Sequence, residues 1–318
     1  MRRKGTGYAS VFYGTGYGNG FPDESRASAE LIPSGVVVIY VGAAEVGQGG
    51  ISTMWQIGAE TLGIRKELVT VRNDSTSIMQ DSGTAAASRQ TYNTGNAVLD
   101  ACRKLRENLE LSVENENIEI EASKLAYIHT LMTNKGIETR TEGYFKATTS
   151  KVDLETGQGN PYWPYSFGTQ KAVVEVDDET GKVDVLEIIT VNDAGKIINP
   201  VLATGQAQGG CAMGIGYALM EEVELSEGNI KNTNFSDYII PTSMDVPKIE
   251  AHFIEEFEAT GPYGAKGMGE SVMIPTAPAI LNAIYDAVGV RITALPATCE
   301  KVLLAIKEKQ REGRNSKQ

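Results

Sequence analysis

One glutamate in this sequence stands where a general base could work. Glu270 ends the run GAKGMGE at 264–270, just ahead of an apolar helical pattern. A carboxylate flanked by glycines can lie uncovered in a cleft and accept a proton, provided that burial and neighbouring charges adjust its pKa. A glutamate that simply caps the next helix is an alternative of similar weight.

A glycine-rich run with one glutamine, GQGG at 47–50, leads into a predicted helix at Ser52–Leu62. The start of a helix carries free N–H groups and the positive end of the helix dipole, so this run could bind a phosphate or another anion. No Lys-Ser/Thr pair follows the glycines, and no GxGxxG occurs in the chain, which excludes the two commonest nucleotide-binding motifs. A tight turn without a ligand remains the alternative.

Two further polar segments offer hydrogen-bonding groups. The segment 81–95, DSGTAAASRQTYNTG, combines small residues with donors, and Arg89 could pair with a phosphate through two parallel hydrogen bonds. Taken alone, this segment is more typical of a capping loop for a helix predicted at Ala97–Leu109. Gln206, which follows the motifs DAG (193–195) and NP (199–200), presents both a donor and an acceptor. It suits the edge of a flat heterocycle, or it is an ordinary helix glutamine.

The composition excludes several classes of protein. The 318 residues carry 29 Lys and Arg against 41 Asp and Glu, a formal net charge of −12, without the basic surface that nucleic-acid binding requires. His129, His252 and the cysteines Cys102, Cys211 and Cys299 are scattered, so we expect neither a metal held by side chains nor a Ser or Cys nucleophile paired with histidine. Unpaired cysteines, and the absence of a signal-like or 18-residue apolar run, indicate a soluble cytoplasmic protein with no membrane partner.

Residue periodicity predicts the elements that must position these groups. Strands are expected at Val36–Val41 and Leu68–Val71, a hairpin at Ala172–Val176 and Lys182–Val191, and helices at Ser52–Leu62, Ala97–Leu109, Ala203–Met220, Ala277–Val288 and Ala297–Lys307. The chain is therefore predicted to be an α+β or mixed α/β protein of two similar halves, 1–145 and 146–318. The boundary falls in the polar stretch 135–165, and a frayed tail is expected at Gln310–Gln318.

Six stretches in this order resemble the C-terminal half of the molybdenum-binding subunit of the xanthine dehydrogenase and aldehyde oxidase family, the molybdenum hydroxylases. They are AEVGQGG (44–50), QIGAETLGI (56–64), ASRQTYNTGNAV (87–98), DAGKIINP (193–200), GQ (205–206) with GIGYAL (214–219), and KGMGE (266–270). The resemblance runs from Gly5 to about Ile306. One such stretch would be weak evidence for the family, whereas all six in this order are highly specific for it.

The resemblance implies a molybdopterin dinucleotide cofactor, typically the cytosine form in bacteria, whose metal is held by the pterin and not by protein side chains. It implies oxidative hydroxylation with water as the oxygen source and Glu270 as the catalytic base. The phosphates would lie at helix N-termini, with Arg89 and Lys266 adding positive charge. The residues that it assigns to cofactor binding are Gly47, Gln48, Gly49, Ala87, Ser88, Arg89, Gln90, Thr91, Gln206, Lys266, Gly267, Met268 and Gly269.

Two departures from the family matter. Ser271 stands where many relatives have a proline after the catalytic glutamate. The other half of the family's molybdenum subunit, and its iron–sulfur and flavin parts, do not occur in this sequence. The resemblance thus implies a medium subunit, as in nicotinate dehydrogenase, working with a larger molybdopterin subunit, an FAD subunit and a 2Fe–2S subunit. The expected substrate is an N-heteroaromatic compound such as nicotinate, xanthine or hypoxanthine. An aldehyde oxidoreductase-type subunit and a non-catalytic molybdopterin assembly or carrier protein are the alternatives.

Overall fold

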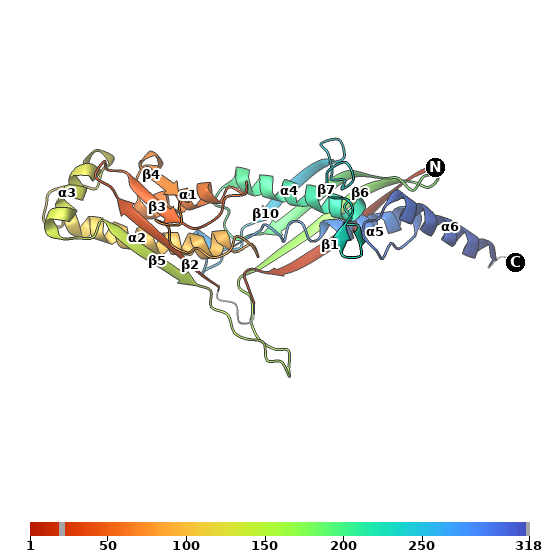
Figure 1. Ribbon diagram of the computed structural model, residues 1–318, viewed down its shortest axis with the longest axis horizontal. Coiled ribbons are helices and arrows are strands. Elements are labelled where there is room, and N and C mark those ends of the chain that lie inside the picture. The colour runs from red at the N-terminus through yellow and green to blue at the C-terminus, as the bar shows by residue number, and fades with distance from the viewer. Residues whose placement is uncertain (19–22, 316–318) are drawn as a thin grey trace.

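Two four-stranded sheets, each with its own helices, lie end to end in an elongated molecule (Figure 1). This computed structural model describes residues 1–18 and 23–315, so the last three residues of the expected tail lie outside the described residues. The chain begins and ends at the same end of the molecule, beside the second sheet (Figure 1).

The first sheet has the strand order β4-β3-β2-β5, formed by Val69–Arg72, Val37–Val41, Glu24–Leu31 and Arg140–Lys146. β2 is antiparallel to both β3 and β5, whereas β3 and β4 are parallel and are joined through helix α1, Gly50–Leu62. The β3 sequence VVIYV is buried at every position. An uninterrupted apolar run of this kind is typical of a central strand in a parallel pair.

The second sheet has the order β1-β6-β7-β10, formed by Arg2–Gly14, Tyr165–Asp177, Val183–Asp193 and Lys248–Ile254. β6 is antiparallel to β1 and β7, whereas β7 and β10 are parallel and are joined through helix α4, Pro200–Leu219. Buried positions alternate along β6, because successive side chains of a strand point to opposite faces. A small hairpin of β8, Leu225–Ser226, and β9, Asn229–Ile230, lies between α4 and β10.

The two sheets share one plan. Read from one edge, each contains two antiparallel pairs and then a parallel pair whose crossover contains a helix, α1 in the first and α4 in the second. Helix α2, Gly95–Val113, packs on β5 and β2, as helix α5, Thr276–Val288, packs on β1 and β6. The expected mixed α/β fold of two similar halves is confirmed.

Glycines on the edge strands let these helices lie close to the sheets. A Cβ atom on Gly143 of β5 would lie 2.0 Å from the carbonyl oxygen of Ala97 in α2, and one on Gly7 of β1 would lie 2.2 Å from that of Ala279 in α5. Helix α3, Leu125–Lys135, packs against α2, and helix α6, Cys299–Asn315, adds Val302 and Ile306 to the second core. The same packing solution therefore recurs in both halves.

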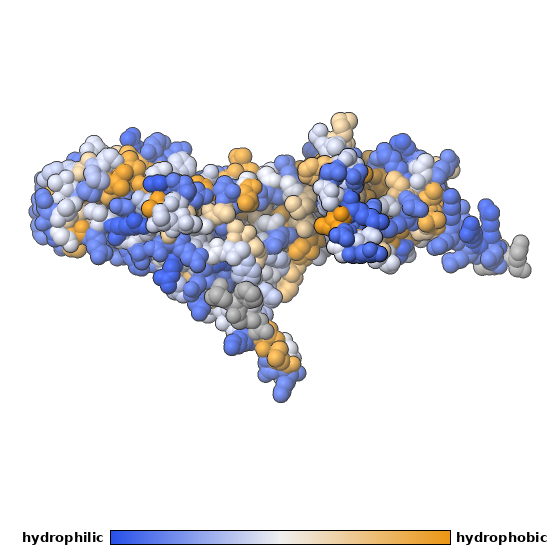
Figure 2. All heavy atoms as spheres, viewed as in Figure 1, coloured by the Kyte–Doolittle hydropathy of each residue, from blue (hydrophilic) through white to orange (hydrophobic). Residues whose placement is uncertain are grey.

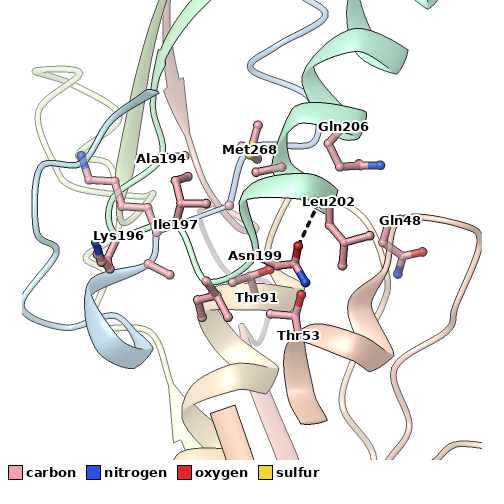
Figure 3. Close-up of a pocket in the computed structure, with 15 residues that line it drawn as sticks. Gln48, Thr53, Thr91, Ala194, Lys196, Ile197, Asn199, Leu202, Gln206 and Met268 are labelled. Carbon is pink, nitrogen blue, oxygen red and sulfur yellow. Dashed lines mark hydrogen bonds between the residues drawn. The ribbon is translucent and has the colours of Figure 1, made fainter. Parts of the chain in front are cut away.

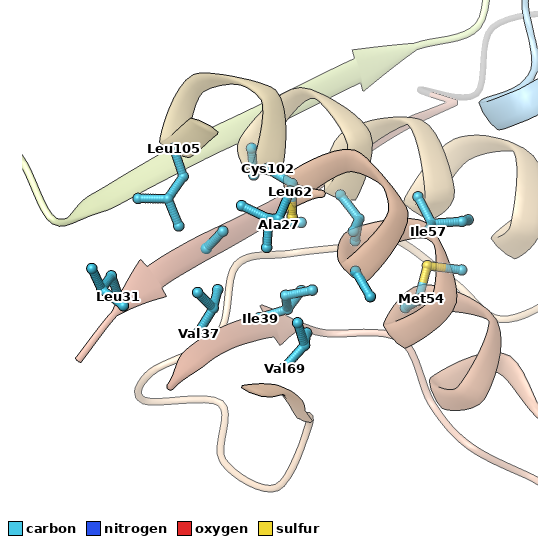
Figure 4. Packing of buried hydrophobic residues seen from close by; sticks show 14 of the residues in the cluster. Ala27, Leu31, Val37, Ile39, Met54, Ile57, Leu62, Val69, Cys102 and Leu105 are labelled. Carbon is cyan, nitrogen blue, oxygen red and sulfur yellow. The ribbon is translucent and has the colours of Figure 1, made fainter. Parts of the chain in front are cut away.

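Each half has its own hydrophobic core. In the first, Ile39 and Val69 of the sheet meet Leu62 of α1 and Leu105 of α2, and all four are 5% exposed or less (Figure 4). Full burial of a side chain of this size stabilises the fold by about 1.5–3 kcal/mol. The second core joins residues of β6, β7, α4, α5 and α6. Site residues between the halves are thus held from both sides.

All the strands and helices expected from periodicity are present, with their ends displaced by up to eight residues. Helix α6 continues to Asn315, so the frayed tail expected from residue 310 is wrong over 310–315. Strands β1, β2, β5 and β10 and helix α3 were not expected. Because β1 belongs to the second sheet, residues 2–14 do not pack with the half expected at 1–145. The division at residue 145 itself stays a prediction.

The segment 147–164 projects from the middle of the molecule as a hairpin-like loop (Figure 1). Backbone hydrogen bonds from Ser150 to Asn160 and from Asp153 to Gln158, both 2.8 Å, close it. Figure 2 shows hydrophobic residues on this projection, and Leu154 within it is 89% exposed. In the part of the chain that the structure describes, no helix is both long and apolar enough to cross a lipid bilayer.

Candidate functional site

The N-termini of the two crossover helices lie beside one pocket. Residues 42–49 lead from β3 into α1, and residues 194–199 lead from β7 into α4. Asn199 caps α4, because its Oδ1 accepts a hydrogen bond of 3.1 Å from the backbone N–H of Leu202 and Pro200 occupies the first turn. The other side-chain atom, Asn199 Nδ2, donates to Gln56 Oε1 on α1 at 2.9 Å. The two halves are therefore joined at this point.

The pocket between these helix starts opens to solvent. Figure 3 shows Gln48, Leu202 and Gln206 close to one another, with Met268 to their left in the view. Of the residues predicted to bind the cofactor, six line the pocket: Gln48, Thr91, Gln206, Lys266, Gly267 and Met268. The structure thus brings together residues that are up to 220 positions apart in the sequence.

The amide nest predicted to bind an anion at the start of α1 already holds a carboxylate of this chain. Glu45 Oε1 accepts hydrogen bonds of 2.9 Å from the backbone N–H groups of both Gly47 and Gly49, and Oε2 accepts one of 3.0 Å from Ile51. Burial opposes ionisation of Glu45, but these backbone donors outweigh it and lower its pKa. In this structure these amides donate to Glu45, and phosphate binding at the start of α1 stays a prediction.

Two glutamines meet at the rim of the pocket. Gln48 donates from Nε2 to the carbonyl of Ala44 at 2.8 Å and to Gln90 Oε1 at 3.3 Å, while its Oε1 accepts from the N–H of Val46 at 2.7 Å. Gln90 begins a π-helical turn, Gln90–Thr94, that runs directly into α2. Its Nε2 is buried and has no hydrogen-bond partner. An unsatisfied buried donor is costly, and this one lies beside Gln48, which lines the pocket, although Gln90 itself does not.

Arg89 does not face the pocket. Its side chain is 1% exposed, its Nε donates to Asp23 Oδ1 at 2.6 Å, and its other nitrogens donate to the carbonyls of Glu24, Ser82 and Thr84. With its donors already used inside the protein, the guanidinium cannot form the expected bidentate pair with a phosphate. Arg89 instead ties the segment 82–89 to the start of β2.

Lys266 is likewise paired. Its Nζ lies 2.5 Å from Asp193 Oδ2 and 5.7 Å from the ring centre of Phe167, and its side chain is 7% exposed. The pair joins the end of β7 to the loop that follows residue 264, where Gly195 and Ala265 form an isolated bridge. The positive charge expected from Lys266 is thus largely neutralised by Asp193.

Glu270 is exposed and held at one oxygen. Its Oε2 accepts hydrogen bonds from Ser88 Oγ at 2.8 Å and from the Tyr13 hydroxyl, and its backbone N–H donates to Ser88 Oγ at 2.9 Å. A Cβ atom on Gly267 would lie 1.6 Å from the carbonyl oxygen of Ser88, so only glycine allows the two loops to lie this close. The predicted residues Ser88, Gly267 and Glu270 therefore form one contact cluster.

The remaining predicted residues have supporting places. Ala87 and Ser88 have positive φ angles of 55° and 53°, and the Ala87 carbonyl accepts from the N–H of Gly16 at 2.9 Å. A Cβ atom on Gly269 would lie 3.4 Å from Ser88 Oγ. These residues shape the loop that presents Ser88 to Glu270.

Sequence reasoning missed several site residues. Tyr13 contacts Glu270 from β1, a strand that was not expected, so nothing linked positions 13 and 270. Glu45 lies inside the motif AEVGQGG but was not given a role. Among the pocket-lining residues, Thr53 lies on a predicted helix and Leu202 directly before one, and only the three-dimensional packing shows that both face the pocket.

The chain belongs to the family of molybdopterin cofactor-binding domains, whose family model matches residues 1–247. It is 32% identical to the xanthine dehydrogenase molybdenum-binding subunit of Escherichia coli O157:H7, over 94% of this chain and 42% of that subunit. It is 34% identical to the nicotine 6-hydroxylase large subunit of Paenarthrobacter nicotinovorans, over 88% of this chain and 36% of that subunit.

Among solved structures, the aldehyde oxidoreductase from Desulfovibrio desulfuricans ATCC 27774 superimposes with a TM-score of 0.85 at 33% identity, over 96% of this chain and 32% of that one. The resemblance to this family that the six motifs indicated is confirmed. The chain spans less than half the length of these relatives. Glu270 lies beyond the residues that the family model matches.

Proposed function

We propose that this chain is the molybdopterin-binding medium subunit of a molybdenum hydroxylase that hydroxylates an N-heteroaromatic substrate, such as nicotinate or a purine, with oxygen from water. The observation that carries the proposal is the exposed Glu270 carboxylate, fixed by Ser88 and Tyr13 two residues after Met268, which lines a pocket together with Gln48 and Gln206. Polar groups converging beside a carboxylate are what a proton-transfer site requires.

The donor set of the pocket fits a pterin dinucleotide. Gln90 Nε2 is a buried donor without a partner, and Gln206 offers an amide with both donor and acceptor atoms to the pocket. Gln48, Gln90, Thr91 and Gln206 are the residues that would hold the group, in its cytosine dinucleotide form. When bound, the molybdenum cofactor supplies two-electron redox chemistry. The overall reaction would convert a C–H bond and water into C–OH, two electrons and two protons.

In this reaction the chain's own contribution is proton transfer and orientation. Glu270 takes up the proton that water loses, and Oε1 is the atom placed to receive it because Oε2 is occupied by two donors. Gly267 keeps Ser88 against this carboxylate. A general base in the correct place contributes about 10²–10⁴-fold to a rate.

The electrons must leave the site, which requires further redox groups. Because the chain spans only 42% of the xanthine dehydrogenase subunit to which it is similar, we assign the rest of the site to a larger molybdopterin subunit. FAD and 2Fe–2S clusters belong, in this proposal, to separate partner subunits. A cytoplasmic location is also part of the proposal, and its support is that Cys102, Cys211 and Cys299 are all free thiols.

The test uses the purified complex and the substitution Glu270→Gln, with Glu138→Gln as a matched control on an exposed site in the first half. Molybdenum should co-elute with both variants, while turnover falls by about 10²–10⁴-fold only in Glu270→Gln. Full activity in Glu270→Gln would contradict the catalytic assignment. A chain that elutes alone and without molybdenum would contradict the whole proposal and favour a carrier or assembly protein.

An aldehyde oxidoreductase-type activity is the second candidate, because the aldehyde oxidoreductase from Desulfovibrio desulfuricans superimposes on 96% of this chain. Parallel assays with nicotinate, xanthine, hypoxanthine and a set of aliphatic and aromatic aldehydes distinguish the two. Oxidation of aldehydes alone would replace the N-heteroaromatic assignment. It would leave the role of Glu270 unchanged.

A further inference from the structure

Two hydroxyl groups from distant parts of the chain hold the same oxygen of Glu270. Tyr13 reaches Oε2 from the end of β1, and Ser88 reaches it from the loop ahead of α2. Within the residues that the structure describes, no hydrogen bond reaches Oε1. The carboxylate therefore has one occupied and one unoccupied oxygen.

Ser88 fixes both the main chain and the side chain of Glu270. Its Oγ accepts from the Glu270 N–H at 2.9 Å and donates to Oε2 at 2.8 Å, which closes a small ring through the side chain. The φ angle of Ser88 is 53°, a conformation that L residues seldom adopt. The close fit of Gly267 against the Ser88 carbonyl maintains it. Backbone strain that is retained beside a reactive group indicates a positioning role.

Tyr13 is placed by strand register. It pairs with Ser166 of β6, whose hydroxyl donates to the Gly267 carbonyl at 2.8 Å. The same residue pair of the sheet therefore positions Tyr13 and holds the loop before Glu270. Burial, and then the hydrogen bond to Glu270, raise the pKa of the Tyr13 phenol. Tyr13 therefore stays protonated and remains a donor throughout the neutral range.

We propose that Tyr13 and Ser88 are positioning residues for the catalytic base: they bind Oε2 of Glu270 so that Oε1 is presented for proton transfer. This inference rests on the proposed function. Neither hydroxyl transfers the proton itself. Both stabilise the ionised carboxylate, since hydrogen bonds to a charged acceptor are stronger than those to a neutral one.

Other ionisable groups near this carboxylate are accounted for. Lys266 is paired with Asp193 at 2.5 Å and so is not the counter-ion of Glu270. A change in kcat on removing Tyr13 or Ser88 can therefore be ascribed to the placement of the Glu270 carboxylate.

Kinetics of the complete complex test the proposal with Tyr13→Phe and Ser88→Ala, and with Tyr8→Phe as the control. Tyr8 lies on the same strand and is 61% exposed. Each test variant should lower kcat by about 10-fold with KM within about 2-fold. Tyr8→Phe should leave both unchanged. An unchanged kcat, or a loss of kcat/KM that comes from KM alone, would overturn the proposal.

A second measurement needs no bound cofactor. In the full chain labelled with ¹³Cζ-tyrosine, the Tyr13 resonance is identified by its loss in Tyr13→Phe. At neutral pH this resonance should shift in Glu270→Gln relative to the unsubstituted chain, because the phenol then donates to a neutral amide and no longer to a carboxylate. Circular dichroism confirms that both chains are folded. An unchanged Tyr13 resonance would show that the contact does not exist.

The two experiments separate the proposals. If the complex does not hydroxylate any substrate but the Tyr13 resonance responds to Glu270→Gln, the contact stands and the proposed function fails. If Glu270→Gln abolishes turnover while Tyr13→Phe and Ser88→Ala behave like the control, the function stands and the positioning role fails.

Discussion

Removing the Asp23 carboxylate should destabilise the first half severely. Asp23 is 3% exposed and Arg89 1% exposed, with 2.6 Å between Oδ1 and Nε, and Asn93 Nδ2 donates to the same oxygen at 2.7 Å. Asp23→Ala leaves the guanidinium buried without a counter-ion. Breaking a buried pair in this way costs about 3–5 kcal/mol, a large part of the 5–15 kcal/mol by which domains are typically stable.

Urea unfolding of the full chain at neutral pH measures this loss, with Asp74→Ala as the control. Asp74 pairs with Arg72 on the surface, where the two side chains are 59% and 44% exposed, so its loss should leave the unfolding midpoint almost unchanged. The double variant Asp23→Ala/Arg89→Met removes both buried charges and should regain part of the stability. A double variant no more stable than Asp23→Ala, or equal effects of Asp23→Ala and Asp74→Ala, would refute the reasoning.

Two further predictions concern the loops. Glu45→Gln should lower the free energy of unfolding by about 1 kcal/mol at neutral pH, since the nest of backbone N–H groups loses its charged acceptor. Because the pKa of Glu45 is lowered in the folded chain, this contribution to stability is present above the ordinary value of 4.5 and is lost as pH falls through the lower folded value. The free energies of unfolding of variant and parent, measured with urea, should therefore converge in acid. Gly267→Ala should displace Ser88 and reduce kcat while leaving molybdenum bound. The control is Gly209→Ala in helix α4, which should leave kcat unchanged because a Cβ atom there would have nothing within 4 Å. Equal kcat in the two variants would contradict the close fit of Gly267 against Ser88.

Local patterns predicted the elements that carry strong periodicity. The apolar residues of helix α1 and strand β3 follow the patterns of a helix and of a buried strand, so both elements could be recognised. Both begin within two residues of their expected starts. Strand β1 could not be recognised, because its run contains Gly5 and Gly7, which are needed only where α5 packs against it. Its place next to β6, more than 150 residues later, is a property of the tertiary fold.

At the site, motifs predicted which loops meet but not which atoms are free. Gln48 and Gln206 do face one pocket, as their amide groups suggested. Arg89 looked like an ideal phosphate ligand because guanidinium groups bind anions in pairs of hydrogen bonds. Whether a guanidinium is available depends on its neighbours, and Asp23, 66 positions earlier, takes that role here. A sequence reader has no means of pairing those two positions.

The same consideration limits the general rule that helix N-termini bind phosphates. Here both crossover helices begin at the pocket, but the amides at the start of α1 are taken by Glu45 and that of Leu202 in α4 by Asn199. Both acceptors come from the chain itself, so these particular amides already have partners before any ligand binds. The unsatisfied donor at this place is a side-chain amide, Gln90 Nε2. We therefore expect this chain to recognise its cofactor chiefly through glutamine side chains, whose donors and acceptors suit a pterin edge better than a phosphate.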